Sequence, residues 1–468
     1  MLSLISTTRG QSLDITSGLT PEVAERLAQW IGCYTFTRNL KIRDYQDQTQ
    51  GLDFADFPKP NQSYSGLCKG VGFLKEVPSQ IKRNASAKWF EDWNSWRKGV
   101  RALPKPRKRG RPWSAFLTNE LFSLRSLGKQ GTEIGLRQSP AKAPFFRISV
   151  PWPVDSIRQG IYIKRHGARF WLSYSRDTEI DVPSRAQVLE SLQNLSESDL
   201  RVSTLGIDAG VAKPFMDSTE KLYQLDPEQT KRVQRREARI KRYQRKVARQ
   251  RDHKKRGEPA SNRIQIAKAK LQREQARLAN VRSNQAHHIS RKIVDSPLIK
   301  VVVVEDLQIA NMTSKPKARW CEDEQRWLPN GARRKSGLNR AILGVAWGKT
   351  FTCLDYKLEA AGKLFVKRKP HFSSQRCNDC GHTAPENRQS QSRFVCTNCG
   401  AEKNADHNAA LNHRDGFIED FTNGTFVDHK TKPKKKLSVR KRAGVGQESP
   451  HEKTDVGASV RPDLQAAA

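Results

Sequence analysis

Two Cys-x-x-Cys pairs constrain this chain more than any other feature of its sequence. They stand 15 residues apart, and Gly400 follows the second pair directly; the four cysteines are Cys377, Cys380, Cys396 and Cys399. This spacing is typical of a site in which four thiolates hold one zinc ion in a tetrahedron. Because a closed shell of four cysteines leaves no position for water, we expect the zinc to be structural. Two disulfide bonds are the alternative for the same residues.

The chain carries a large excess of basic residues. Its 468 residues include 85 lysines and arginines against 48 aspartates and glutamates, a formal net charge of +37. A solvated surface does not need this excess, whereas binding to a polyanion does, so we predict nucleic acid as a partner. A basic protein of the membrane surface is the alternative, but no long basic amphipathic helix stands out. No apolar run is long enough for a membrane span or a signal peptide, and we expect a cytosolic or nuclear protein.

The first hundred residues combine a strand-like start with a helical block. We expect a short strand within residues 1–16 and then a helix that begins with Thr20 as its cap and Pro21 as its first residue. A second helix is expected from about residue 79, with tryptophans at helical spacing at positions 89, 93 and 96. These rings either pack in a core or stack on bases. A basic segment, residues 104–112, follows.

Short β-branched and aromatic runs then predict a small β-barrel. They cover residues 114–119, 145–151, 161–164 and 169–175, and turn residues separate them. The helical block would be an insertion between the first strand of this barrel and the others.

Three acidic residues in the second half of the chain follow a common logic. Asp208 and Glu305 each end a buried, nearly apolar strand, where an acid is costly unless charged groups or a metal ion lie beside it. Asp406 lies at a helix start just after the second cysteine pair. The alternatives are a turn-forming role for Asp208 and a helix-capping role for Asp406. Brought together, the three carboxylates would hold two Mg²⁺ or Mn²⁺ ions, the arrangement that hydrolyses phosphodiester bonds.

Residues 227–295 predict two long helices with a break near residues 257–259. The first has a basic face, which is either a track for phosphates or an ordinary solvated surface; it comprises Arg232, Arg235, Arg236, Arg239, Arg242, Lys246 and Arg249. Residues 313–338 look irregular, residues 339–361 predict one helix closed by Gly362, and residues 364–367 a strand. Beyond about residue 415 the hydrophobic periodicity ends, which predicts a disordered basic tail.

These motifs resemble the TnpB proteins, the RNA-guided nucleases encoded by insertion sequences, which are related to compact type V CRISPR effectors. The resemblance is carried by GIDAG at 206–210, VVVVEDL at 301–307 and NADHNAA at 404–410. It is also carried by the stretch 338–377, which ends at the first cysteine, and by residues 386–396. It is strong from about residue 200 to 412 and weaker before that.

The resemblance implies an α/β fold with additional all-β and helical parts, namely a RuvC/RNase H-like nuclease domain with an inserted zinc ribbon, preceded by a wedge-type β-barrel that carries an inserted helical recognition domain. The implied boundaries are 1–18 and 109–200 for the barrel, 19–108 for the recognition domain, 201–370 for the nuclease domain with its long helices at 227–295, 371–403 for the ribbon, 404–415 for the third nuclease motif, and 416–468 for the tail.

The resemblance also implies roles for individual residues. Asp208, Glu305 and Asp406 would be the catalytic ligands of two Mg²⁺ or Mn²⁺ ions, and the four cysteines would hold one structural Zn²⁺. Arg376 would contact the cleaved strand. Nucleic-acid contacts are further expected from Arg232, Arg235, Arg239 and Arg242, and recognition of a motif beside the target from Tyr34, Ser79, Gln80, Lys82 and Asn84.

The function implied is that of an RNA-guided DNA endonuclease in the prokaryotic cytoplasm, associated with the nucleoid. Its partners would be a guide RNA and double-stranded target DNA, with no membrane and an oligomeric state left open. A compact type V effector that uses a CRISPR RNA is one alternative. A guided repressor that binds without cutting is another, although all three acids are present. A DNA-joining transposase is the third.

Overall fold

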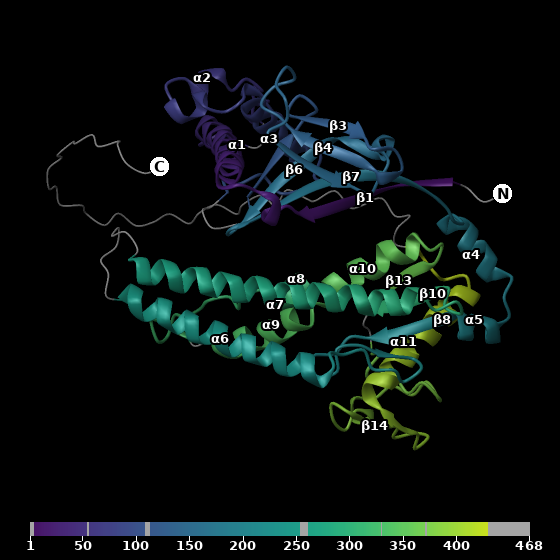
Figure 1. Cartoon of the computed structure of the whole chain (residues 1–468). Helices are drawn as coiled ribbons and strands as arrows, with labels where there is room; N and C mark the ends of the chain where they lie inside the picture. Colours follow the sequence, from purple (N-terminus) through teal and green to yellow (C-terminus); the bar gives the residue numbers. More distant parts are fainter. Residues whose placement is uncertain are drawn as a thin grey trace.

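The computed structural model describes residues 4–53, 56–107, 113–252, 261–328, 330–369 and 372–428. Part of the basic segment 104–112, the predicted helix break near residue 257 and the basic tail beyond residue 428 lie outside these ranges. Figure 1 shows two parts: the N-terminal strands and helices lie above a second part built on two long helices and a parallel sheet. The chain is therefore a mixed α/β protein, as predicted.

The strands of the N-terminal part form two antiparallel sheets, with strand orders β1-β7-β6-β2 and β3-β4-β5. The first strand of the chain pairs with the last of this part, Leu4 opposite Asp181 and Asp14 opposite Trp171. The strands are β1 (Leu4–Asp14), β2 (Trp113–Leu117), β3 (Phe122–Ser126), β4 (Thr132–Leu136), β5 (Phe146–Val150), β6 (Ile157–His166) and β7 (Arg169–Asp181). The sequence predictions missed β3 and β4.

Three helices lie in the chain between β1 and β2: α1 (Pro21–Gln48), α2 (Ser65–Cys68) and α3 (Ser79–Arg97). The predicted start of α1 is confirmed, because Thr20 caps it by accepting a hydrogen bond from the amide of Val23. The tryptophans of α3 are buried beside two residues of α1, so they pack in a core as one alternative predicted; this cluster is Ile42, Tyr45, Trp89, Trp93 and Trp96. The remaining core of α1 is continuous with that of the two sheets.

A further sheet, largely parallel, organises the C-terminal part, with the order β13-β10-β8-β9. It comprises β8 (Thr204–Asp208), β9 (Met216–Asp217), β10 (Val301–Glu305) and β13 (Leu364–Arg368). β8, β10 and β13 run parallel, and β9 is antiparallel to β8. Val304 lies beside Ile207, and Glu305 beside Arg368. The carboxyl ends of three parallel strands, at Asp208, Glu305 and Arg368, therefore lie at one edge.

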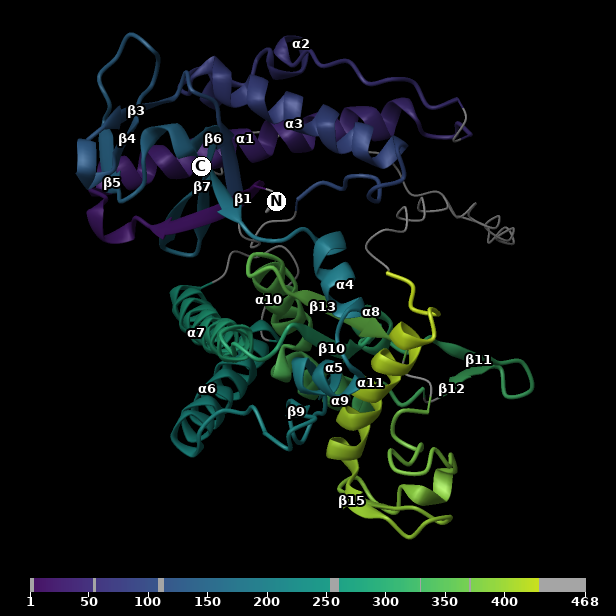
Figure 2. The ribbon, with the colours of Figure 1, turned by 90° about the vertical axis from the view of Figure 1, so that its right-hand side faces the viewer.

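Helices cover both faces of this sheet, because the valines of β10 alternate between two apolar clusters. Val302 and Val304 face α7 (Asn262–Val294) and α10 (Trp347–Glu359). Val301 and Val303 face α4 (Arg185–Gln193), α5 (Glu197–Ser203) and α11 (Ala405–Thr422). α6 (Pro227–Asp252) lies alongside α7, and Figure 2 shows α11 on the side of the sheet away from α7.

One predicted helix is two helices. α9 (Ala332–Val345) and α10 meet at Ala346, whose φ of 62° lies in the left-handed region. Such a conformation is unfavourable for alanine. The indole of Trp347, the next residue, donates a hydrogen bond to the carbonyl of Gly210 at 3.1 Å. This contact ties the start of α10 to the loop after β8, so tertiary structure overrides the good helix propensity of alanine here.

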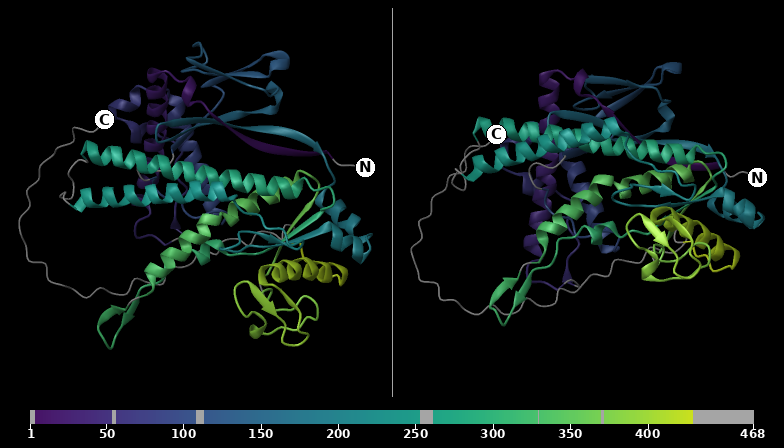
Figure 3. Two further views of the ribbon diagram at one scale, coloured as in Figure 1. Left: turned by 60° about the horizontal axis from the view of Figure 1, so that its bottom comes forward. Right: turned by 90° about the horizontal axis from the view of Figure 1, so that it is seen from below.

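Two further predictions about the chain are wrong. The segment 313–338, predicted as irregular, contains the hairpin β11 (Arg319–Cys321) and β12 (Arg326–Leu328), which projects away from the rest of the molecule (Figure 3). The short helix α8 (Ile309–Met312) precedes it. The tail predicted from residue 416 does not begin there: α11 continues to Thr422, Phe417 is fully buried, and Asp428 forms an ion pair with Arg185 at 2.5 Å. The apolar residues between residue 416 and residue 428 are too few to give a periodic pattern in the sequence.

Among the described residues, no helix is both long and apolar enough to cross a membrane.

Candidate metal centres

The sheet brings Asp208 and Glu305 side by side. The residues before them, Ile207 and Val304, are paired in the parallel ladder, so the two acids follow at the same level of neighbouring strands. A carboxylate oxygen from each lies within 4.8 Å of the other and of a ring nitrogen of His413, from α11. These three side chains could hold a metal ion.

Asp406, the third predicted acid, approaches from the first turn of α11. The cap of this helix is Asn404, whose side-chain oxygen accepts hydrogen bonds from the amides of Asp406 and His407 at 3.1 and 3.4 Å. The capping role considered for Asp406 therefore belongs to Asn404. The Asp406 carboxylate lies 3.8 Å from the guanidinium of Arg388 and is close enough to Asp208 to act on its ionisation.

Burial disfavours the charged forms of all three acids, and at Asp208 the other two acids add to the effect. Burial raises the pKa of Asp208 to about 7, with a further contribution from the charges of Asp406 and Glu305. Burial also raises the pKa values of Glu305 and Asp406, although Lys213 and Arg388 partly offset this at Asp406. Hard carboxylate oxygens crowded in this way form a donor set that suits a divalent cation, which would relieve the repulsion.

Close backbone contact holds α11 against β8. A Cβ atom placed on Gly206 would lie only 2.0 Å from the carbonyl oxygen of Ala410 and 2.8 Å from the amide of Arg414. Gly206 and Asp208 are two residues apart on the strand, so both face α11. A glycine at position 206 therefore allows the strand that carries Asp208 to lie directly against the helix that carries Asp406.

We expect Gly206→Ala to separate α11 from the sheet. The added methyl group meets backbone atoms, which cannot move aside as a side chain would, so the helix must shift. The midpoint of thermal unfolding should fall by about 5 °C or more. Gly337→Ala, within α9, is the matched control because nothing lies within 4 Å of its added Cβ atom; it should not lower the midpoint. An unchanged midpoint for Gly206→Ala would contradict this account of the contact.

The four cysteines converge as the spacing predicts. Their sulfur atoms all lie within 4.8 Å of one another. Cys377 Sγ lies 3.7 Å from Cys399 Sγ, and Cys380 Sγ lies 3.5 Å from Cys396 Sγ. Tetrahedral zinc with Zn–S bonds of about 2.3 Å would place its sulfurs about 3.8 Å apart, whereas a disulfide needs about 2.05 Å. The geometry therefore favours a thiolate site for one zinc ion over two disulfides.

Buried asparagines connect the segment that carries the four cysteines, residues 372–404 (the cysteine module), to α11. Asn408 accepts a hydrogen bond from the amide of Asn378 at 3.1 Å and donates to the carbonyl of Arg376 at 2.8 Å. Asn412, one turn on, donates to the same carbonyl at 2.7 Å. The module includes the hairpin of β14 (Arg393–Val395) and β15 (Glu402–Asn404), which leads directly into α11 (Figure 2). The position of Asp406 thus depends on the cysteine module.

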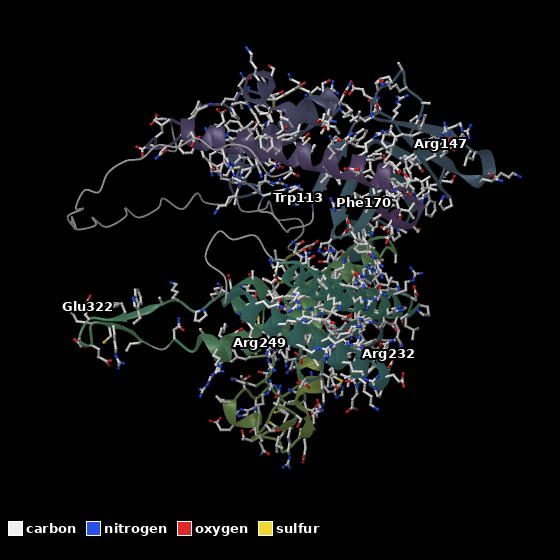
Figure 4. All side chains as sticks on the ribbon, turned by 60° about the vertical axis from the view of Figure 1, so that its left-hand side comes forward. Trp113, Arg147, Phe170, Arg232, Arg249 and Glu322 are labelled. Atoms are coloured by element: carbon white, nitrogen blue, oxygen red, sulfur yellow. The ribbon has the colours of Figure 1, made fainter. Side chains whose placement is uncertain are left out.

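The basic face of α6 is exposed, and one acidic residue of α7 pairs with part of it. Arg232, Arg235, Arg239 and Arg242 are all exposed, and Figure 4 shows Arg232 and Arg249 well separated along this part of the molecule. Glu274 of α7, which is 6% exposed, lies 3.1 Å from Arg236 and 4.0 Å from Arg239. This buried carboxylate ties α6 to α7 and leaves most of the basic face available to a polyanion.

The five residues predicted to recognise a motif beside the target differ in their exposure to solvent. Tyr34 and Asn84 are only 2% and 4% exposed, so neither side chain is presented on the surface, and the prediction is wrong for these two. Their helices turn these faces toward the sheets: Asn84 donates to Thr118 at 3.2 Å. The Lys82 amine donates to the carbonyl of Leu74 at 2.8 Å. Ser79 is exposed and Gln80 half-buried.

Two residues beside the acids, Arg388 and His413, were not predicted from the sequence. Arg388 follows the 3₁₀ turn Pro385–Asn387 of the cysteine module, and His413 lies in α11. Neither has a local signal, since a lone arginine or a histidine in an apolar helix is usually structural. Arg376 lies at the first cysteine pair as expected and forms an ion pair with Glu419 at 3.4 Å.

Comparisons with known proteins agree with the motifs. Residues 185–315 match a family described as a probable transposase (OrfB_IS605), and residues 347–413 match the Cas12f1-like TNB domain. The chain is 29% identical over 343 residues to a putative RNA-guided DNA endonuclease, InsQ, of Escherichia coli (strain K12), covering 73% of this chain and 75% of that protein.

A CRISPR-associated endodeoxyribonuclease, Cas12f1 of Sulfoacidibacillus thermotolerans, is 32% identical over 140 residues, which is 29% of this chain and 27% of that protein. Among solved structures, a Cas12f1–sgRNA–target DNA complex aligns with a TM-score of 0.48 at 15% identity, over 84% of this chain and 83% of that one. The resemblance to TnpB proteins and compact type V effectors, predicted from the motifs, is confirmed by the sequence relatives.

Proposed function

We propose that this chain, as a relative of the TnpB proteins, is an RNA-guided DNA endonuclease. One observation carries the proposal: Asp208 and Glu305, far apart in the sequence, lie side by side at one edge of the parallel sheet, and Asp406 is close enough to act on the ionisation of Asp208. The net charge of +37 and the exposed arginines of α6 supply the surface for a guide RNA and its duplex with DNA.

The acids would hold the catalytic metal ions. The fit is supported by the crowded carboxylates and by the raised pKa of Asp208. When bound, two divalent ions supply an activated water and stabilise the leaving oxygen of a phosphodiester. The four cysteines would hold one structural Zn²⁺, and their role is to fix the segment that carries Arg388 and leads into Asp406.

The architecture is consistent with the domain scheme that the resemblance to TnpB proteins implies. In this proposal the parallel sheet with α6, α7 and α11 is the RuvC/RNase H-like nuclease domain, interrupted by the zinc ribbon at 371–403. The two antiparallel sheets form the wedge-type barrel, and α1–α3 form the recognition domain inserted in it. Ser79, Gln80 and Lys82 remain candidates for reading a motif beside the target, and the protein would act in the prokaryotic cytoplasm on nucleoid DNA.

Sequencing the RNA that copurifies with the full chain tests the guided half of the proposal. The protein should be expressed in cells that also carry its native flanking DNA. A discrete structured RNA that ends in a variable segment from the edge of the element is the expected result. A repeat-spacer RNA would instead assign the chain to the CRISPR effectors, which the match to Cas12f1 makes the second candidate. No defined RNA would overturn the guided function.

Arg388 is expected to contact the phosphate that is cut. Its guanidinium lies 3.8 Å from Asp406 and, at 30% exposure, remains accessible from solvent. A guanidinium at this position can bind phosphate oxygens and stabilise the charge that develops on them. Arg388→Gln should therefore slow single-turnover cleavage about a hundredfold and leave the affinity for target DNA nearly unchanged. Arg393→Gln, in the same module but paired with Glu402, is the control and should cut normally. Equal rates for the two variants would exclude this role.

A further inference from the structure

His413 is a buried histidine without a partner for one of its nitrogens. The residue is 1% exposed, and its Nε2 atom has no hydrogen-bond partner among the described residues. A ring nitrogen of His413 lies within 4.8 Å of carboxylate oxygens of both Asp208 and Glu305. Leaving a buried nitrogen unpaired is costly, and the imidazole lies where a metal ion held by the two carboxylates could also take a ring nitrogen.

The helix brings this imidazole to the same site as the third acid. His413 follows Asp406 by seven residues, which is nearly two full turns, so both project from one face of α11. The contact between Gly206 and Ala410 fixes the helix over β8 between these two positions. Asp208 and Glu305 are thus approached by a carboxylate from the first turn of α11 and by an imidazole two turns later.

We propose that His413 is a direct ligand of one of the divalent ions, through a ring nitrogen. The proposal rests on the function proposed above, in which the acids hold divalent ions, and it adds a nitrogen donor to that all-oxygen set. Because imidazole binds first-row transition metals better than Mg²⁺, the ion at this position should be a metal such as Mn²⁺ or Co²⁺ in preference to Mg²⁺. The identity of the metal would then be set by a residue outside the acidic triad.

Pulsed electron paramagnetic resonance of bound Mn²⁺ tests this directly. The full chain, with zinc already in the cysteine site, is titrated with Mn²⁺ and examined for coupling of the metal to nitrogen. Wild-type protein should show ¹⁴N coupling, and labelling its histidines with ¹⁵N should change the pattern. This labelling experiment needs no substitution, so it holds even if a variant folds poorly.

Variants then identify the histidine. His413→Leu should abolish the nitrogen coupling and weaken Mn²⁺ binding about tenfold, with a smaller loss for Mg²⁺. His407→Gln is the matched control on the same helix, because its ring nitrogen lies 3.4 Å from the carbonyl of Ser218, and it should keep the coupling.

The possible outcomes separate this inference from the proposed function. Mn²⁺ that binds without nitrogen coupling, or with coupling that survives in His413→Leu, would overturn the role of His413 and leave the acidic metal site standing. Wild-type protein that binds no Mn²⁺ would overturn both. Weaker binding in His413→Leu with no coupling in the wild type would mean that His413 only positions the acids.

Discussion

Asp208→Asn is expected to reduce DNA cleavage by about a thousandfold or more while guide-dependent binding of the target persists. The substitution removes one charge from the centre of the acidic cluster, where a carboxylate oxygen lies within 4.8 Å of both Glu305 and His413. Nothing else in the contact with nucleic acid changes, because the basic surface lies on other elements. Cleavage rates and filter binding with the same guide and target measure the two effects.

Asp306→Asn is the matched control for this substitution. Asp306 directly follows Glu305, but it is 42% exposed and pairs with Lys367 at 3.8 Å. Its loss should leave cleavage within about twofold of the wild type. Cleavage that survives in Asp208→Asn would remove this residue from the catalytic site.

Asp208→Asn should also stabilise the metal-free protein against unfolding at neutral pH. The pKa of Asp208 is raised to about 7 when folded, whereas an aspartate in an unfolded chain titrates near 4. A raised carboxyl pKa means that the folded state holds its proton more tightly, so stability is lost as the pH rises through this window. Between about pH 5 and pH 8 the wild type should lose about 3 kcal/mol relative to Asp208→Asn. Denaturation of zinc-loaded protein without other divalent ions measures this, and parallel pH profiles would contradict the assigned pKa.

Cys396→Ala should unfold the cysteine module and abolish cleavage. Removing one of four thiolates leaves an incomplete shell, and in small zinc modules the binding energy of the metal is the folding energy. The hydrogen bonds of Asn408 and Asn412 to the Arg376 carbonyl would then be lost, and with them the anchoring of the first half of α11. Zinc content should fall from one equivalent toward zero, and proteolysis should cut within residues 372–404.

Cys321→Ala serves as the control for the loss of a thiol. Cys321 is the last residue of β11 in the projecting hairpin and directly precedes Glu322, which is labelled in Figure 4. It is not among the four clustered cysteines. This variant should keep its zinc and its activity. A Cys396→Ala protein that cuts DNA normally would show that the module has no structural role.

Much of the nuclease half was predictable because its signals are local. An apolar run that ends in an acid marks β8 and β10, and the Cys-x-x-Cys spacing marks the thiolate site. The break at Ala346 was not predictable, because alanine favours helix and the cause is a distant hydrogen bond from Trp347 to Gly210. The short strands β3 and β4 were missed since their five residues each lie between glycines and polar residues, where turn signals dominate.

Of the candidate metal site, only the three acidic residues could be predicted from the sequence. Three acids of the cluster had a sequence signal, but Arg388 and His413 reach it through folding of the module and of α11. Tyr34 and Asn84 show the opposite error: polar side chains on helices looked available, yet those faces pack against the sheets. Which face of a helix is buried depends on the elements that pack against it, and the sequence of the helix alone does not identify those elements.

The position of α11 at the end of the described chain also governs when activity can arise. The ribosome makes Asp208 and Glu305 first, and the helix with Asp406 and His413 follows about a hundred residues after Glu305. At about 5–20 residues per second, this interval lasts about 5–20 s. During that time the nascent protein displays its basic helices without a complete centre for cutting. A growing chain can therefore engage RNA before it is able to damage DNA.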